Sequence, residues 1–245
     1  MSGFPDDFID LVVTSPPYDS LRSYQGYDFD YKLVADQLYR VMKIGGVVIW
    51  VVGDATVNGS ETLTSFKHAL YFKAIGFRVH DTMIWNKPNF SNPSSNRYHQ
   101  IFEYMFVFSK GKPKTFNPIK DKVNKYSECF GRNTSRLPSG EMVERSKNTI
   151  GSMGMRHNVW VMNTAGQENV CKSLPHPAMF PDVLARDHIL SWSNEGDLVL
   201  DPMCGSGTTC KMAKLSNRNY IGIDISEEYC KLAEERISLE QSKIT

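Results

Sequence analysis

The sequence has no apolar run close to the roughly 20 residues that a membrane-spanning helix requires. Its first ten residues, MSGFPDDFID, lack the basic and apolar regions of a signal peptide. The five cysteines are odd in number and scattered, and they show no spacing typical of metal ligands. These absences exclude a disulfide-rich secreted domain and a structural zinc module. They predict a cytoplasmic protein without a membrane or metal partner.

The net charge is also small, +1 over 245 residues, but it is unevenly distributed. Residues 110–175 contain twelve basic and five acidic residues, so this segment carries +7 and the rest of the chain −6. A basic block on a near-neutral protein predicts a surface that binds a polyanion. A solvated loop region without a partner explains the charge equally well.

Short apolar runs alternate with stretches of helical spacing on both sides of the basic block. The predicted strands are Ile9–Val13, Val47–Val52, Val79–Trp85, Tyr104–Phe108, Leu198–Leu200 and Tyr220–Ile223. The predicted helices are Leu33–Met42, Thr62–Ile75, Ala178–Trp192, Thr208–Leu215 and Glu227–Leu239. This alternation predicts an α/β fold with a mostly parallel, doubly wound sheet, whose two halves are residues 1–110 and 175–245. Residues 111–174 have little periodicity and are predicted to form an insertion of loops and short elements.

A glycine-rich loop follows the predicted strand that ends near Asp201. Gly205 and Gly207 allow a tight turn and a close approach of the backbone to a ligand. Asp224, about 20 residues later, ends the next strand, where a carboxylate can accept hydrogen bonds from both hydroxyls of a ribose. The loop is neither G-x-G-x-x-G nor a P-loop, which favours a nucleoside cofactor without a diphosphate, such as S-adenosylmethionine. Asp201 then faces the positively charged amino group of the cofactor. An ordinary helix-capping turn is the alternative, and spacing alone does not decide between the two.

The predicted strand Ile9–Val13 runs into a second motif, Thr14-Ser15-Pro16-Pro17-Tyr18. Ligands bind at the carboxyl ends of parallel strands, and the two prolines make this turn rigid and remove two N–H donors. The hydroxyl and carbonyl of Ser15 and the carbonyl of Pro16 therefore project as acceptors, beside the aromatic face of Tyr18.

These groups suit the methylation of an amino group on an aromatic ring. The lone pair of such an amine is delocalised and poorly nucleophilic. Two acceptors that hold its hydrogens in a tetrahedral arrangement would localise the lone pair, while Tyr18 stacks on the extruded base. A rigid structural turn is the alternative if the motif stands alone.

Together and in this order, the motifs resemble those of the amino-methyltransferases of bacterial restriction–modification systems. The match is to the permuted (beta) class, in which the catalytic motif precedes the cofactor motif. It is carried by Thr14–Tyr18, Ile84–Asn89, His176–Pro181, Asp201–Thr209 and Tyr220–Ser226. The resemblance covers nearly the whole chain outside the middle insertion.

The resemblance implies a Rossmann-like domain with a mixed sheet of about seven strands, S-adenosylmethionine as cofactor and double-stranded DNA as partner. The segment His176–Pro181 would pack against the methionine part of the cofactor. The catalytic residues would be Ser15, Pro16, Pro17 and Tyr18. The cofactor-binding residues would be Thr14, His176, Pro177, Phe180, Asp201, Pro202, Met203, Gly205, Ser206, Gly207, Thr208, Asp224 and Ile225.

By position and charge, the target-recognition region is the insertion 111–174. Arginine is the residue that most often contacts phosphate and guanine. The candidate DNA contacts are Lys87, after a predicted strand, and Arg132, Arg136, Arg145 and Arg156 of the insertion. Asp54, after the strand Val47–Val52, is a further candidate near the pocket.

Ser15 stands where many relatives have Asp or Asn, which is similar to the branch that methylates N4 of cytosine. Methylation of adenine N6 is the alternative, and an inactive methyltransferase fold that only binds DNA is another. Many members also have a strand and a Gly-Asp turn before the catalytic strand, whereas only eight residues precede it here. That departure puts the affinity for the cofactor in question. The resemblance leaves open a homodimer and a companion restriction endonuclease as further partners.

Overall fold

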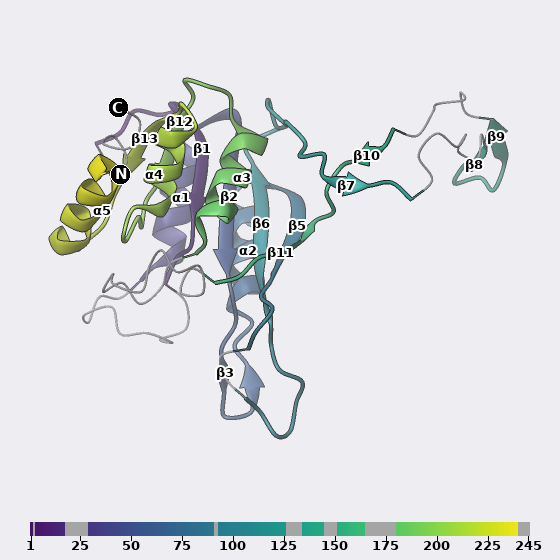
Figure 1. Ribbon diagram of the computed structural model, residues 1–245, viewed down its shortest axis with the longest axis horizontal. Coiled ribbons are helices and arrows are strands. Elements are labelled where there is room, and N and C mark those ends of the chain that lie inside the picture. The colour runs from purple at the N-terminus through teal and green to yellow at the C-terminus, as the bar shows by residue number, and fades with distance from the viewer. Residues whose placement is uncertain are drawn as a thin grey trace. The chain divides into compact units, whose positions relative to one another are not determined.

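The computed structural model describes residues 1, 3–17, 29–90, 93–125, 134–144, 151–164 and 180–239. Its centre is a mixed sheet of seven strands (Figure 1). In order across the sheet these are β11 (Val159–Val161), β5 (Arg78–Asn86), β6 (Phe102–Ser109), β2 (Met42–Val52), β1 (Ile9–Thr14), β12 (Leu198–Asp201) and β13 (Asn219–Gly222). Only β6 runs antiparallel to its neighbours, and the other pairings in this sheet are parallel. The predicted α/β fold is confirmed.

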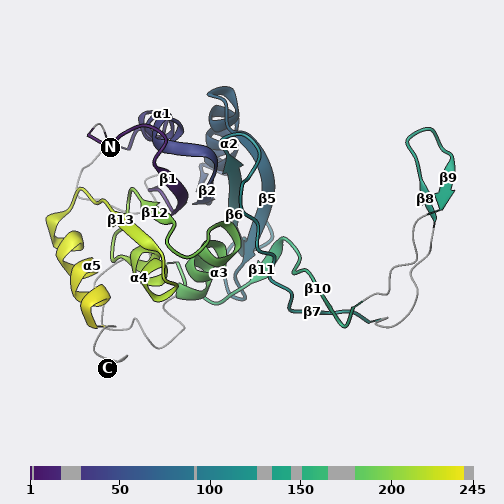
Figure 2. The ribbon, with the colours of Figure 1, turned by 90° about the horizontal axis from the view of Figure 1, so that it is seen from above.

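Helices cover both faces of the sheet (Figure 2). The helices α1 (Tyr31–Val41) and α2 (Thr64–Ala74) lie on one face, and α3 (Asp182–Trp192) and α4 (Thr208–Leu215) lie on the other. Alternate residues of β2 enter different cores because successive side chains of a strand point to opposite faces. Ile49 and Val51 pack with α3, whereas Val48 and Trp50 pack with α1 and α2. The helix α5 (Glu227–Leu239) packs beside α4.

Most element boundaries agree with the sequence pattern, and α4 and α5 have the predicted bounds. Most of the others shift by one or two residues, and two boundaries differ by more. The strand β2 starts at Met42 rather than Val47, because Met42 already pairs with Ile9 before an irregular stretch of register. The helix α3 starts at Asp182 rather than Ala178. Pro181 is its extended N-cap, and a proline disfavours helical backbone in the residue before it.

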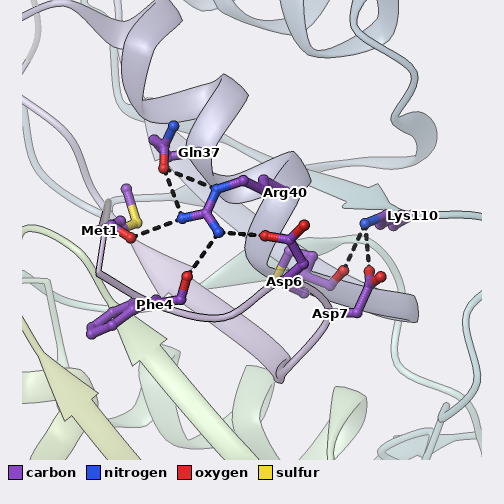
Figure 3. Close-up of polar contacts among 8 residues, drawn as sticks. Met1, Phe4, Asp6, Asp7, Gln37, Arg40 and Lys110 are labelled. Atoms are coloured by element: carbon purple, nitrogen blue, oxygen red, sulfur yellow. Dashed lines mark hydrogen bonds and ion pairs between the residues drawn. The ribbon is translucent and has the colours of Figure 1, made fainter.

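The guanidinium group of Arg40 in α1 binds several groups of the N-terminal segment (Figure 3). The two terminal nitrogens of Arg40 donate to the carbonyl oxygens of Met1 at 2.9 Å and Phe4 at 2.8 Å, and to the Asp6 carboxylate. Gln37, one turn earlier in α1, accepts from the same guanidinium. This network aligns the chain as it enters β1, the strand that carries the predicted catalytic motif.

The chain divides into two compact units, residues 1–117 with 158–245, and residues 118–157. The second unit contains two small two-stranded sheets. They are formed by β7 (Lys122–Val123) with β10 (Met153–Gly154) and by β8 (Thr134–Arg136) with β9 (Met142–Glu144). It falls within the predicted insertion 111–174, whereas β11, also within that range, is an edge strand of the main sheet.

A further hairpin of β3 (Thr56–Val57) and β4 (Ser60–Glu61) follows β2. Within the described ranges, no helix is both long enough and apolar enough to cross a membrane.

Candidate active site

The two sequence motifs, 187 positions apart in the chain, meet where β1 and β12 end. The two strands are parallel neighbours, and the Thr14 hydroxyl donates to Oδ1 of Asp201 at 2.7 Å. The Thr209 hydroxyl of α4 donates to the carbonyl oxygen of Val13 at 3.0 Å. The connection after β1 leads to β2 on one side, and that after β12 leads to β13 on the other. This point is therefore the topological switch of the sheet, the place where α/β proteins bind ligands.

We call the contact between the ends of β1 and β12 the junction. Asp201 lies at this junction and is only 2% exposed. Burial raises the pKa of its carboxyl group to about 6, against the lowering effect of hydrogen bonds from Thr14, Thr209 and the backbone N–H of Met203. The nearby Asp224 raises the pKa slightly further. Asp201 therefore joins the end of the catalytic strand to the start of the glycine loop through one buried carboxylate.

The glycine loop is connected on its other side to the end of β13. The backbone N–H of Cys204 donates to the carbonyl oxygen of Ile223 at 2.8 Å, and that of Gly205 to Oδ2 of Asp224 at 2.8 Å. Oδ1 of Asp224 accepts from the N–H of Ser226 at 3.0 Å. The partly buried Asp224 thus shapes the loop, and two of the roughly four lone-pair positions of a carboxylate are used in these contacts.

Gly207 ends the loop with φ of +78° and is the N-cap of α4. A Cβ atom at this position would lie 2.7 Å from the Cβ of Ala233 in α5. Both the positive φ and the close helix require glycine here. The loop and α5 are therefore packed against each other.

A cluster of charged residues that the sequence analysis did not identify contacts the glycine loop on the side of α5 and α3. Nη1 of Arg236 in α5 donates to the carbonyl oxygen and hydroxyl of Ser206 at 2.6 and 2.7 Å. Its side chain is nearly buried and also lies 3.8 Å from Asp182, the first residue of α3. Asp182 forms an ion pair with Lys211 of α4, which is buried as well. The available signal was Lys211 itself, a charge between the apolar residues Cys210 and Met212.

The predicted catalytic turn begins directly after this junction. Pro16 is buried, and Ser15 and Pro17 are partly buried. Tyr18, His176 and Pro177 lie outside the described residues. Phe180 is partly buried and packs against the core on the α3 side of the sheet.

The remaining predicted cofactor residues follow β12 and β13. Pro202, Ser206 and Thr208 are buried, Met203 is partly buried, and Ile225 is exposed. Thr14, also a predicted cofactor residue, is fully buried under the junction. No three His, Cys, Asp or Glu side chains of the described part form a cluster able to hold a metal ion.

The predicted DNA-contacting residues differ in how far their charge is already neutralised. Nζ of Lys87 is 2.7 Å from Oε1 of Glu103, and Arg156 is paired with Asp121. The Nε of Arg136 donates to the carbonyl oxygen of Gly140, a neutral partner, at 3.1 Å. Arg132 and Arg145 fall outside the described ranges.

Asp54 has a structural role in α2. Its two carboxylate oxygens accept from the backbone N–H and the hydroxyl of Ser65 at 2.8 and 2.6 Å. Ser65 lies in the first turn of α2, where backbone N–H groups lack partners within the helix. The carboxylate therefore caps this helix, which is a sufficient reason for its position after β2.

Comparison with known proteins assigns this architecture to a family. Residues 9–235 match the N6/N4 methyltransferase family, described as DNA methylase. The orphan methyltransferase M.BamHII of Bacillus amyloliquefaciens is 55% identical over 237 residues, which cover 95% of this chain and 89% of that protein. The type II methyltransferase M.HpaI of Haemophilus parainfluenzae is 27% identical over 253 residues, covering 98% and 71%.

Solved structures agree with this assignment. A putative DNA modification methylase of Thermus thermophilus, complexed with S-adenosyl-L-methionine, matches with a TM-score of 0.64 and 26% identity over 98% of this chain and 90% of that one. The cytosine-N4-specific PvuII DNA methyltransferase shares the fold, with a TM-score of 0.65 and 20% identity over 97% and 86% of the two chains.

The geometry of this chain fits the same cofactor. Asp224 follows β13 in the sequence, and its contacts with Gly205 and Ser226 use two of the roughly four lone-pair positions of the carboxylate, while the glycine loop brings backbone close to the switch point. The predicted cofactor is thus confirmed. The chain belongs to the N6/N4 DNA methylase family and is an S-adenosylmethionine-dependent methyltransferase that modifies an amino group of a DNA base.

Proposed function

We propose that this enzyme methylates the exocyclic N4 amine of cytosine within a specific sequence of double-stranded DNA. The observation that supports the proposal is the bond between Thr14 and Asp201, which brings the Ser-Pro-Pro turn to the glycine loop. A methyl donor in the loop and an amine at the turn then lie at the same edge of the sheet.

The residues of the turn prepare the amine for reaction. The Ser15 hydroxyl or carbonyl and the Pro16 carbonyl accept the two amine hydrogens, so that the nitrogen lone pair points away from the ring plane and toward the loop. Pro17 stiffens the turn, and Tyr18 is assigned to stacking on the extruded base. Bound S-adenosylmethionine supplies an electrophilic methyl group on its sulfonium. No covalent bond between enzyme and base is needed.

Residues on both sides of the junction are assigned to the cofactor. Asp224 accepts hydrogen bonds from the ribose hydroxyls. The ionised carboxylate of the buried Asp201 attracts the ammonium group of the cofactor without direct contact. The other assigned residues are Thr14, His176, Pro177, Phe180, Pro202, Met203, Gly205, Ser206, Gly207, Thr208 and Ile225. The segment 111–174 is assigned to target recognition, with Arg132, Arg136, Arg145, Arg156 and Lys87 as DNA contacts.

Ser15 favours cytosine over adenine, because it replaces the Asp or Asn found in many relatives with similar motifs. Expression in a methylation-free bacterial host, followed by mass spectrometry of the digested DNA, decides the base. We expect N4-methylcytosine. Detection of N6-methyladenine instead would show that adenine is the target base.

Activity itself is tested with purified enzyme and labelled cofactor. We expect labelled methyl groups in duplex DNA and none in RNA. Binding of DNA without any methyl transfer would indicate the inactive fold instead. We propose a cytoplasmic location. A homodimer and a companion endonuclease stay predictions, and the relative in Bacillus amyloliquefaciens is described as an orphan.

A further inference from the structure

Beside the catalytic turn, the same edge of the sheet carries a second feature that the assigned chemistry does not use. The hairpin of residues 53–62 follows the carboxyl end of β2, and residues 88–90 and 93–101 come after the carboxyl end of β5 and the already assigned Lys87. These strands are parallel to β1, so their ends lie at its carboxyl edge. Figure 1 shows the β3 hairpin projecting beyond the sheet there. We call these residues the arm.

One arginine joins the two segments of the arm. Nη1 of Arg97 donates to the Thr56 hydroxyl at 3.2 Å, and Nη2 donates to the carbonyl oxygen of Gly59 at 2.8 Å. Both partners are neutral. No ion pair found among the described residues includes Arg97. The arm therefore carries a positive charge that is oriented but not neutralised.

Tyr98, the next residue, is fully exposed. The residue after it, His99, is held within the arm. Its ring centroid lies 3.9 Å from that of Phe90 with the two rings tilted by 38°, and its Nε2 lies 3.3 Å from the carbonyl oxygen of Ser94. Because Arg97 and His99 are both fixed by contacts inside the arm, the backbone between them directs the Tyr98 ring into solvent.

We propose that the arm is a second DNA-contacting element, in which Arg97 neutralises a backbone phosphate and Tyr98 stacks on bases beside the extruded target. A base that leaves the helix leaves its neighbours unstacked, and an aromatic ring compensates for that loss. The inference rests on the proposed methylation of duplex DNA. It adds a component that stabilises the opened duplex, separate from the basic insertion.

The chemistry of the arm fits nucleic acid better than a protein partner. A protein interface is typically built around a desolvated apolar centre. Around Tyr98 the sequence is Ser94-Ser95-Asn96-Arg97 and His99-Gln100, which consists of hydrogen-bond donors and a cation. The arm also exposes part of Phe90 and Val57, but the fully exposed ring of Tyr98 next to an arginine is the combination that stacks on bases and follows a phosphate backbone.

The test compares two duplexes that contain the methylated site, once that site has been mapped. One is fully paired, and in the other the target base faces an abasic position, where opening costs less. We expect Tyr98→Ala to lower kcat/KM roughly ten- to hundredfold on the paired duplex, and far less on the abasic one. Tyr98→Phe keeps the ring, and Ile44→Ala removes an exposed apolar side chain at the opposite edge of the sheet. Both should stay within about twofold of wild type.

Arg97 is tested by its effect on the salt dependence of DNA affinity, measured by fluorescence anisotropy. Arg97→Ala should reduce the slope of log affinity against log salt concentration by about 1, and Arg97→Lys should preserve it. Cofactor affinity, measured by calorimetry, should be unchanged in every variant.

The inference is overturned if Tyr98→Ala behaves as wild type on the paired duplex, or loses the same factor on both duplexes. If the wild type methylates neither duplex, the proposed function fails. In that case the anisotropy of Tyr98→Ala and Arg97→Ala still decides whether the arm binds DNA, and unchanged affinity in both overturns the inference.

Discussion

At the scale of single residues, Asp201 shows how position changes chemistry. A free aspartate has a pKa near 3.9, whereas burial raises that of Asp201 to about 6. Between these values the folded protein holds a proton that the unfolded chain releases. Folding stability from this group is therefore fully present below about pH 4, and it is lost as the pH rises through about 6.

This linkage gives a measurable prediction for Asp201→Asn. The wild type should lose about 3 kcal/mol from this group between pH 4 and 7, and the variant should not, because an amide does not titrate. Urea unfolding at several pH values measures the difference in unfolding free energy between the two proteins. Glu227→Gln, at an exposed residue of α5, is the control, and its profile should run parallel to that of wild type.

Gly207 gives a second residue-scale prediction. Gly207→Ala should lower the unfolding free energy by roughly 2–4 kcal/mol, because the new Cβ adds a clash with Ala233 to the strain of a positive φ. Gly59 has a similar φ of +81° but open space around it. Gly59→Ala should therefore cost only about 1–2 kcal/mol. Equal losses in both variants would show that the contact with α5 is unimportant.

At the scale of elements, α5 acts as a clamp on the glycine loop. Arg236→Gln removes the charge-assisted bonds to Ser206, so the loop should lose order and cofactor affinity should fall roughly tenfold. Calorimetry with S-adenosylmethionine measures this change. Lys231→Gln, which breaks an exposed ion pair one turn earlier in α5, is the matched control and should bind normally. A normal affinity in Arg236→Gln would contradict the clamp.

The elements also show what the sequence could predict. The apolar run Val47–Val52 and the loop Gly205–Thr208 depend on local pattern, and both occupy the expected places in the fold. The clamp by Arg236 and the arm held by Arg97 depend on contacts between distant segments, which no local pattern encodes. Asp54 shows the opposite case, since a carboxylate after a strand at the site edge caps a helix.

At the scale of the whole molecule, the uneven distribution of charge separates DNA binding from cofactor binding. The basic block is opposed by a net negative remainder, so attraction to DNA is confined to part of the surface. Affinity for duplex DNA should therefore fall steeply between roughly 50 and 200 mM salt. Affinity for the cofactor, whose proposed contacts include few charges, should change little.

Two arginines of the basic block provide the comparison. Arg136→Ala should reduce the salt slope of DNA binding by about 1, because the partner of this guanidinium among the described residues is a neutral carbonyl. Arg156→Ala should reduce the slope less, because Asp121 already neutralises Arg156. Fluorescence anisotropy over a salt series measures both slopes. A larger effect at Arg156 would show that its ion pair opens on DNA.

The adjacency of β1 and β12 also governs when the enzyme becomes competent. The strand that leads into the proposed catalytic turn emerges from the ribosome first, and its partner strand follows almost two hundred residues later. Contacts between such distant segments form slowly, because a long loop must close before they do. A nascent or truncated chain that ends before residue 201 therefore lacks the glycine loop that we propose to bind the methyl donor. Methyl transfer by the proposed site therefore requires a chain that contains both β1 and β12.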